Sequence, residues 1–367
     1  MNIKDAIITE SKRIGIDIIG FTDCKPFYEA EQVLIQREKM NFLSGFEDKD
    51  IKKRIDPKKT MEDCKTIISI GVSYNTPSDK VPIKKDYIHK GVVSRSSWGE
   101  DYHAVLSRKL KKLSLFIEQS LNGKTKFFVD TGSLIDREIA RRAGIGYVGK
   151  NCSIINKEYG SYIFLGEILT DLHISPDKTV DSLCGDCELC IKSCPANALE
   201  KPYTLNAKKC ISYLTQCKDL PNEYYKKMGN SIYGCDACQR VCPKNKTALK
   251  SNHTEFYPME WNAYPDLVDV LNMDNRRFKD TFNKTSGGWR GKKNLQRNSI
   301  IAMGNSKNKN IAKYIEAMLY DDRIDIRKTS IYALYNLLGK ESIPMLKRRL
   351  EYERDDGIIS IINKLVY

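Results

Sequence analysis

The chain has 367 residues, of which 41% are hydrophobic and 29% are charged. This composition is typical of a globular protein, and the length suits two or three domains rather than one. The longest apolar stretches, residues 66–72 and 162–165, are far shorter than the ~18–20 residues that span a bilayer. Charges interrupt the N-terminal segment every few residues, which argues against a signal-peptide core. We therefore expect a cytoplasmic protein with no membrane partner, in which cysteines serve mainly as metal ligands or catalysts.

The net charge of +14 is larger than a small anionic substrate needs, so it favours a polyanionic partner such as a nucleic acid. A generally basic protein is the alternative, and clustering of the charge distinguishes the two. Nine of the twelve cysteines also cluster, between Cys184 and Cys242. We expect three domains: residues 1–175 with mixed strands and helices, a cysteine-rich part over 176–250, and a basic helical part over 251–367.

Apolar spacing predicts several regular elements in the first part. They are a helix over 3–14, a buried strand over 66–72, an amphipathic helix over 101–122, and strands over 126–129 and 161–169. This mixture predicts an α+β sheet domain.

Asp130 follows the strand predicted over 126–129, at the start of a turn into a helix that we expect to run through Ala143. Either Thr131 or Ser133 could cap that helix. A carboxylate at a strand end is a common place for catalysis, although a structural turn aspartate is the alternative. The glycines of 144–150 resemble a loose dinucleotide-binding loop, but they follow a helix, so we do not expect a Rossmann turn.

The cysteine region begins with four cysteines separated by two, two and three residues and followed by Pro195. This is the run of bacterial ferredoxins, in which the fourth cysteine binds the other of two [4Fe–4S] clusters. By pseudo-symmetry one cluster is held by Cys184, Cys187, Cys190 and Cys242, and the other by Cys194, Cys210, Cys235 and Cys238. Cys217 is an alternative to Cys210. Zinc sites, which usually pair two CxxC units, explain this spacing poorly.

The positive charge clusters near residues 276–297. The candidate RNA-binding side chains there are Lys279, Lys284, Arg290, Lys292, Lys293 and Arg297. Phe282 and Trp289 lie among them. In RNA-binding proteins, basic side chains hold the phosphates and aromatic side chains stack on unpaired nucleobases. Gly287 and Gly288 are expected to form a pliable loop. A solvated charged face is the alternative.

Residues 295–303 align with 326–334 at an offset of 31 residues, and a third, degraded copy begins near Ile358. This internal repeat predicts HEAT-like helical pairs that stack into a concave surface.

Several of these segments together resemble the epoxyqueuosine reductase family. They are residues 95–103 (RSSWGEDYH), 129–132 (VDTG), 141–146 (RRAGIG), 149–151 (GKN), 164–167 (FLGE), 210–215 (CISYLT) and 232–236 (IYGCD). The motifs occur in order and cover nearly the whole chain. Two positions depart from the family pattern: Ser133 replaces a proline, and Ser94 replaces a frequent cysteine.

The resemblance implies an N-terminal α/β domain that binds cobalamin, a ferredoxin-like domain with two [4Fe–4S] clusters, and an all-α C-terminal domain. It implies reduction of the epoxide of epoxyqueuosine in tRNA to queuosine, the last step of queuosine biosynthesis. Asp130 would be the proton donor, and we expect burial against the corrin to favour its neutral form. The expected cobalamin contacts are Arg54, Asp130, Ser153, Glu167 and Ser212. The expected partners are the tRNA anticodon stem-loop and an external low-potential electron donor, with the protein a monomer.

Two other functions remain open at this point. One is another corrinoid iron–sulfur reductase, such as a dehalogenase. The other is an electron carrier or RNA-binding iron–sulfur module without its own catalysis, which predicts no corrinoid binding and no effect of Asp130→Asn.

Overall fold

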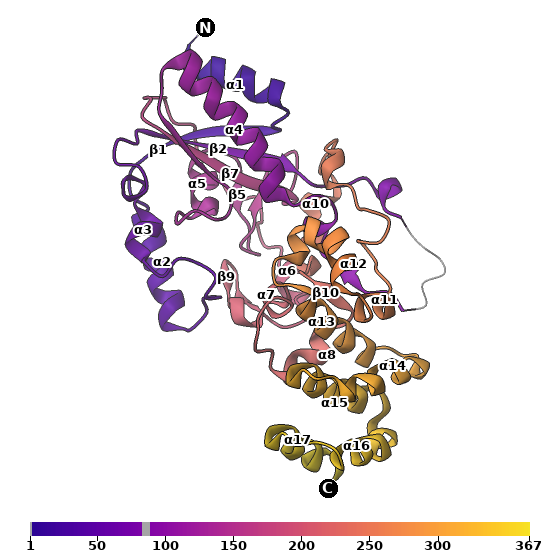
Figure 1. The fold of residues 1–367 in the computed structure, drawn as a ribbon. Helices are drawn as coiled ribbons and strands as arrows, with labels where there is room; N and C mark the ends of the chain where they lie inside the picture. The colour runs from indigo at the N-terminus through magenta and orange to yellow at the C-terminus, as the bar shows by residue number, and fades with distance from the viewer. Residues whose placement is uncertain (1, 83–88) are drawn as a thin grey trace. The chain divides into compact units, whose positions relative to one another are not determined.

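The computed structural model describes residues 2–82 and 89–367, which fold into two compact units interleaved along the chain (Figure 1). Unit 1 comprises residues 1–80, 100–210 and 236–257, and unit 2 comprises 81–99, 211–235 and 258–367. Within the described ranges, no helix has both the length and the apolar character needed to cross a bilayer.

The centre of unit 1 is an antiparallel sheet of four strands in the order β1-β2-β7-β4. The strands are β1 (Ile18–Asp23), β2 (Thr66–Ser73), β7 (Ile163–Thr170) and β4 (Thr125–Phe128). The three strands predicted from the sequence are therefore confirmed, with ends that differ by one or two residues. In β2 all eight residues are buried, because both faces of the sheet are covered.

Helices α1 (Ile3–Ile14) and α4 (Tyr102–Leu121) cover one face of this sheet, and α5 (Asp136–Arg142) covers the other (Figure 1). The alternation of side chains along β2 explains this arrangement. Ile68 and Ile70 belong to the core with α1 and α4, whereas Ile67 belongs to the core with α5. The predicted helices over 3–14 and 101–122 are confirmed.

The segment between β4 and α5 differs from its prediction. Helix α5 begins only at Asp136, after Ile135, which makes no side-chain cap. The Ser133 hydroxyl instead donates to the Asp48 carboxylate at 2.9 Å. The expected cap by Thr131 or Ser133 is therefore wrong, and the residues around Asp130 form a loop.

Smaller elements of unit 1 surround the cysteine-rich segment. They are the hairpin strands β5 (Tyr147–Val148) and β6 (Ile154–Ile155), the pair β8 (Leu199–Lys201) and β9 (Thr204–Leu205), and helices α6 (Leu189–Lys192), α9 (Ala237–Arg240) and α10 (Pro243–Lys246). Helices α2 (Tyr28–Lys39) and α3 (Ile51–Ile55) lie between β1 and β2 in the chain. Cys24 and Cys64 form a disulfide, which the sequence did not predict.

Unit 2 is mainly helical. Its helices are α7 (Ile211–Leu214), α8 (Tyr225–Met228), α11 (Leu267–Leu271), α12 (Asn275–Asp280), α13 (Lys292–Gly304), α14 (Ala312–Ala317), α15 (Ile324–Leu338), α16 (Ile343–Leu350) and α17 (Asp356–Val366), beside a short parallel pair of β3 (Val92–Val93) and β10 (Ser231–Tyr233). The two best copies of the sequence repeat lie in α13 and α15, and the degraded copy lies in α17. Helix α15 packs against both α13 and α17, so the repeated segments form a consecutive stack.

Candidate active site and iron–sulfur cluster sites

Asp130 lies two residues beyond the end of β4, in the loop before α5. Its φ of 56° is in the left-handed region, which non-glycine residues seldom adopt and which is enriched at functional sites. Its side chain is 62% exposed. The turn and the strand end therefore present this carboxylate to a ligand.

The first turn of α4 supplies two partners for Asp130. The Tyr102 hydroxyl donates to Asp130 Oδ2 at 2.8 Å, and His103 Nε2 lies 3.6 Å from the same oxygen. The other ring nitrogen, His103 Nδ1, lies 2.7 Å from Asp101 Oδ1. Asp101 also caps α4 through the backbone N–H of His103. One helix start therefore orients an imidazole between two carboxylates.

This geometry determines which of His103 and Asp130 are ionised. Burial opposes the charged form of His103, but its interactions with Asp101 and Asp130 raise the pKa of the imidazole to about 9. The interaction with His103 and the hydrogen bond from Tyr102 lower the pKa of Asp130 despite some burial. Within the polypeptide alone these groups thus hold Asp130 ionised and His103 protonated at neutral pH. The expected effect of burial against a corrin on Asp130 stays a prediction.

Two further carboxyl groups lie near Asp130: the buried Glu167 and the half-buried Asp136. Glu167, on β7, is 1% exposed, and its Oε1 has no hydrogen-bond partner within the described chain. Burial, with the charges of Asp136 and Asp130, raises its pKa. Burial and the Asp130 charge also raise the pKa of Asp136. Because two adjacent carboxylates cannot both ionise at low cost, the pair holds a proton more readily than ordinary carboxyl groups do.

Three guanidinium groups from three helices approach this region: Arg37 on α2, Arg54 on α3 and Arg137 on α5. Burial, and then the neighbouring Arg137 charge, lower the pKa of Arg37, and burial also lowers the pKa of Arg54. Arg37 Nε is buried and unpaired within the described residues. Arg137 donates to the carbonyl of Cys152 at 2.6 Å. Arg37 and Arg54 are half-buried and Arg137 is exposed, so the three helices bring three positive charges together.

These contacts link four of the five predicted cobalamin-binding residues within unit 1. Asp130, Arg54 and Glu167 all interact electrostatically with Asp136 or Arg137, and Ser153 adjoins the carbonyl that Arg137 contacts. Ser212 lies in unit 2, so its role stays a prediction. The sequence analysis missed the roles of Tyr102, His103, Asp136, Arg37 and Arg137. The DYH segment was a signal for the first two, since it places them directly after a helix-capping aspartate.

The cysteines predicted to hold the first cluster surround one pocket in unit 1. Cys184, Cys187, Cys190 and Cys242 line this pocket. The other lining residues are Lys150, Asn151 and Leu183, together with Ile155 of β6, Leu189 of α6, and Pro243 and Lys244 of α10. The pocket has about 400 Å³ of space, including its open mouth. Four thiols that converge on one pocket, although Cys242 is distant in sequence, match the crossed spacing of a bacterial ferredoxin.

The four cysteines predicted to hold the second cluster do not all belong to one unit. Cys194, Cys210 and Cys238 belong to unit 1, whereas Cys235 is the last residue of the middle segment of unit 2. This ligand set therefore remains a prediction from the spacing. Cys217, the alternative ligand, is 4% exposed, and its thiol contacts two backbone carbonyl groups of its own segment.

The basic segment of unit 2 contains both exposed and buried side chains. Lys279, Lys284 and Lys293 are exposed, and Trp289 is 53% exposed, with the Arg290 guanidinium 4.6 Å from its ring centroid. Arg297 is only 4% exposed and donates to the carbonyls of Leu214, Cys217 and Lys218. These internal contacts occupy its guanidinium, so its assignment to RNA binding is wrong.

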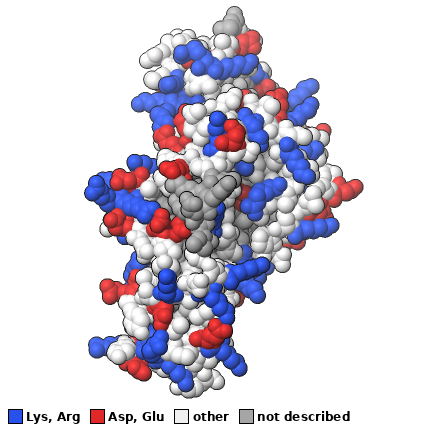
Figure 2. All heavy atoms as spheres, turned by 90° about the vertical axis from the view of Figure 1, so that its right-hand side faces the viewer, with Lys and Arg blue, Asp and Glu red and all other residues white. Residues whose placement is uncertain are grey.

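Two other expectations for this segment also fail. Phe282 is 3% exposed and packs in the core of unit 2, which leaves Trp289 as the stacking candidate. Gly287 and Gly288 are buried in a short 3₁₀ helix rather than in a pliable loop. On the face drawn in Figure 2, lysine and arginine side chains are interspersed with acidic ones, so the excess charge forms no single uninterrupted patch there.

Comparison with known proteins assigns the chain to a family. The family model "Epoxyqueuosine reductase QueG, DUF1730" matches residues 54–131, and that of a 4Fe-4S double cluster binding domain matches 183–245. Epoxyqueuosine reductase of Bacillus cereus is 43% identical over 99% of this chain and 96% of its own length. The chain belongs to the epoxyqueuosine reductase family.

Solved structures of epoxyqueuosine reductases agree over the full length. One, a complex with an epoxyqueuosine-modified tRNA stem loop, has a TM-score of 0.94 at 40% identity and covers 99% of this chain and 97% of that one. Another, from Bacillus subtilis, has a catalytic aspartate loop swung out of the active site; its TM-score is 0.92 at 39% identity, covering 99% and 98%. The QueG match extends from Arg54 to Thr131 and includes Asp130, and the double-cluster match includes all eight predicted ligand cysteines.

Proposed function

We propose that this chain reduces the epoxide of epoxyqueuosine in tRNA to the alkene of queuosine. The observation that carries the proposal is the match, over nearly the whole chain, to epoxyqueuosine reductases, one of them bound to an epoxyqueuosine-modified tRNA stem loop. The exposed Asp130 with its proton-holding neighbours supplies the acid–base group that such a reaction requires.

We assign two [4Fe–4S] clusters to the double-cluster domain. Cys184, Cys187, Cys190 and Cys242 would hold one cluster, and Cys194, Cys210, Cys235 and Cys238 the other. The pocket lined by the first four cysteines supports this division.

Cobalamin is the proposed second cofactor. Its corrin periphery carries amide groups, which need both hydrogen-bond donors and acceptors. Unit 1 provides an unpaired buried donor in Arg37 Nε and an unpaired buried acceptor in Glu167 Oε1, so its residues fit the group. Arg54, Asp130, Ser153 and Glu167, with Ser212 of unit 2, are the proposed contacts. When bound, cobalamin would supply the strongly reducing cobalt centre that the clusters recharge.

Conversion of an epoxide to an alkene and water consumes two electrons and two protons. In this proposal Asp130 passes a proton to the departing oxygen, and the hydrogen bond from Tyr102 supports its orientation. His103 holds the proton that restores Asp130, because the ring lies between Asp130 and Asp101. The Asp136–Glu167 pair holds a further proton beside Asp130. The site therefore holds both protons that one turnover consumes.

The tRNA would be bound by the basic segment, through Lys279, Lys284, Arg290, Lys292 and Lys293 with Trp289 for stacking. The stacked helices α13, α15 and α17 support a HEAT-like repeat, whose concave surface suits an anticodon stem-loop. In this proposal residues 1–175 form the cobalamin domain, 176–250 the cluster domain and 251–367 the tRNA-binding domain of a monomer. An external low-potential donor provides the electrons.

Anaerobic turnover tests the proposal. Reconstituted protein, cobalamin and a strong reductant are incubated with tRNA that contains epoxyqueuosine, and the nucleosides are measured by mass spectrometry. The proposal predicts cobalamin-dependent loss of one oxygen atom. No loss from protein with clusters and cobalamin both bound would remove epoxyqueuosine as the substrate.

A further inference from the structure

Among the buried polar groups of unit 1 that lack hydrogen-bond partners within the described part of the chain, two lie on one hairpin. They are the hydroxyl of Tyr147, which is 2% exposed, and the amide nitrogen Nδ2 of Asn151, which is 6% exposed. A buried donor without an acceptor costs about 1–3 kcal/mol, and native structures keep few of them. Both donors are therefore expected to face an acceptor that the polypeptide itself does not supply.

Both groups belong to the hairpin of β5 and β6, and both are near the cysteine pocket. Asn151 lines the pocket with Cys184, Cys187, Cys190 and Cys242. Its Oδ1 accepts from the backbone N–H of Ser153 at 3.2 Å, which fixes the amide orientation and leaves Nδ2 as the free end. The Tyr147 hydroxyl lies close enough to Cys184 and Cys242 to interact with both of them electrostatically.

The hairpin is held in a fixed position, so these orientations are not those of a loose loop. Tyr147 pairs with Ile155 in the antiparallel ladder. Gly146 approaches the facing backbone so closely that a Cβ there would lie 2.4 Å from the carbonyl oxygen of Ile155. Only glycine permits this contact, which holds the two strands of the hairpin close together beside Tyr147.

We propose that Tyr147 Oη and Asn151 Nδ2 donate hydrogen bonds to sulfur atoms of the cluster held by Cys184, Cys187, Cys190 and Cys242, and that they raise its reduction potential. The reduced cluster carries one more negative charge than the oxidised one, and this charge resides largely on sulfur. Hydrogen bonds to sulfur therefore stabilise the reduced state more than the oxidised state. The inference rests on the ligand set proposed above.

Redox titration of the full-length, reconstituted protein, followed by electron paramagnetic resonance, tests the proposal without tRNA or cobalamin. Tyr147→Phe keeps the ring and removes the donor, and Asn151→Leu keeps the size and removes the amide. Each should move the potential of one cluster to a more negative value and leave the other unchanged, and the double variant should show a larger shift. Tyr225→Phe is the matched control, since that buried hydroxyl already pairs with Thr329.

Unchanged potentials in both single variants, or equal shifts of both clusters, would overturn the proposal. Iron and sulfide content is measured for each variant. If either variant loses the cluster, the proposal is tested on the wild-type protein instead. Electron–nuclear double resonance of its reduced cluster is recorded before and after exchange into D₂O. Exchangeable protons strongly coupled to that cluster are expected, and their absence would also overturn the proposal. The separate turnover assay keeps a failure here distinguishable from a failure of the proposed function.

Discussion

His103 Nε2 lies 3.6 Å from Asp130 Oδ2, and the two side chains form an imidazolium–carboxylate pair at the end of β4. Since a carboxylate cannot donate a proton, the proposed role of Asp130 as an acid requires another group that returns a proton to it. In this proposal the adjacent imidazolium of His103, which lies between Asp101 and Asp130, provides that proton.

Replacement of Asp130 by asparagine tests the proposed proton donor. Asp130→Asn keeps the shape of the side chain and removes the transferable proton, so we expect turnover to fall by about 100-fold or more. Iron content and cobalamin binding should stay unchanged. Asp171→Asn, in an exposed turn where the carboxylate accepts from the Lys124 backbone, is the control and should remain active. Full turnover by Asp130→Asn would remove Asp130 from the mechanism.

The titration of His103 can be measured directly by NMR of the imidazole in the protein without substrate. The raised pKa of about 9 means that the ring is charged at neutral pH and loses its proton as the pH rises through about 9. The ion pairs of His103 with Asp101 and Asp130 contribute their full stabilisation below the ordinary histidine pKa of about 6.5. This stabilisation is lost as the pH rises through about 9. Turnover should therefore decline above about pH 9.

Asp101→Asn removes one of the two carboxylates that stabilise the imidazolium. The pKa of His103 should then fall toward its ordinary value, and the alkaline decline of turnover should move to lower pH with it. A His103 pKa that does not change in Asp101→Asn would contradict the proposed return of a proton from His103 to Asp130.

Serine variants of the cysteines test how the two clusters are divided. Cys190→Ser and Cys242→Ser should each lose about half of the iron, and the double variant should lose no more, because both ligands belong to one cluster. Cys190→Ser with Cys194→Ser should lose nearly all of it, although these cysteines are neighbours in the sequence. Cys217→Ser should retain all of the iron. A Cys190/Cys194 double variant that keeps half of the iron would refute the crossed arrangement.

The exposed lysines of the basic segment are expected to contact tRNA phosphates. The double variant Lys279→Ala/Lys284→Ala should bind tRNA several-fold more weakly. The slope of log K against the logarithm of the salt concentration should become shallower by about 0.7–0.9 for each lost phosphate contact. Lys59→Ala in unit 1 is the matched control. Arg297→Ala should instead lower the thermal stability, because it removes hydrogen bonds from a buried guanidinium to three backbone carbonyls. Binding with an unchanged salt slope in the double variant would contradict the proposed surface.

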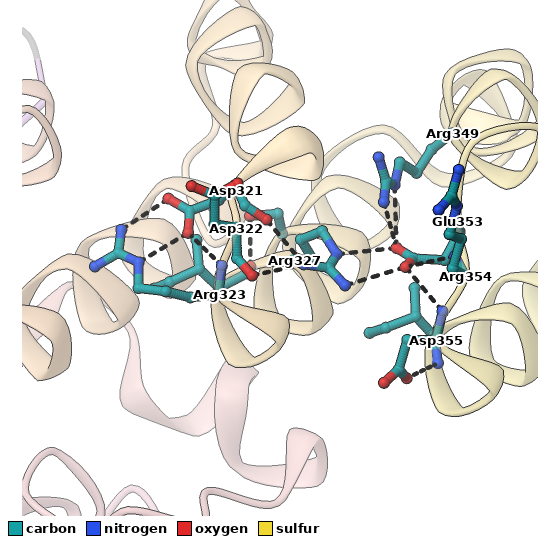
Figure 3. Close-up of polar contacts among 11 residues, drawn as sticks. Asp321, Asp322, Arg323, Arg327, Arg349, Glu353, Arg354 and Asp355 are labelled. Atoms are coloured by element: carbon teal, nitrogen blue, oxygen red, sulfur yellow. Dashed lines mark hydrogen bonds and ion pairs between the residues drawn. The ribbon is translucent and has the colours of Figure 1, made fainter.

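Glu353 provides a test of stability in unit 2. Its side chain is 2% exposed and lies between Arg327 and Arg349 (Figure 3). Burial opposes its ionisation, but hydrogen bonds from the two arginines prevail and lower its pKa to about 2. The stabilisation is present above the ordinary glutamate pKa, about 4.3, and is lost as the pH falls toward 2.

Glu353→Gln should lower the free energy of unfolding at neutral pH by roughly 1–3 kcal/mol, measured by chemical denaturation. The difference from the wild type should shrink below about pH 4. The exposed pair of Lys309 and Glu341 offers the control Glu341→Gln, which should cost less than about 1 kcal/mol. A cost for Glu353→Gln that does not depend on pH would contradict the assigned ionisation.

The sequence by itself determined the features that depend on local spacing. The period of apolar residues located α1 and α4, and the runs of apolar residues located β2 and β7. The spacing of the cysteines indicated two clusters, and the double-cluster match agrees. Asp130 was selected because it follows a strand, which needs only a few neighbouring residues to recognise. The 31-residue repeat located α13 and α15 in the same way.

Only the tertiary structure decided the properties that depend on burial and on charges far apart in the chain. Asp130 is ionised because α4 brings His103 to it across 27 residues of sequence. The pKa of Glu167 is raised because β7 is buried and because the charges of Asp136 and Asp130 lie nearby. Arg297 looked like an RNA ligand by charge alone, yet helix packing directs it to internal carbonyls. Local patterns specify elements and ligand types, whereas the protonation state and accessibility of a side chain depend on its surroundings in three dimensions.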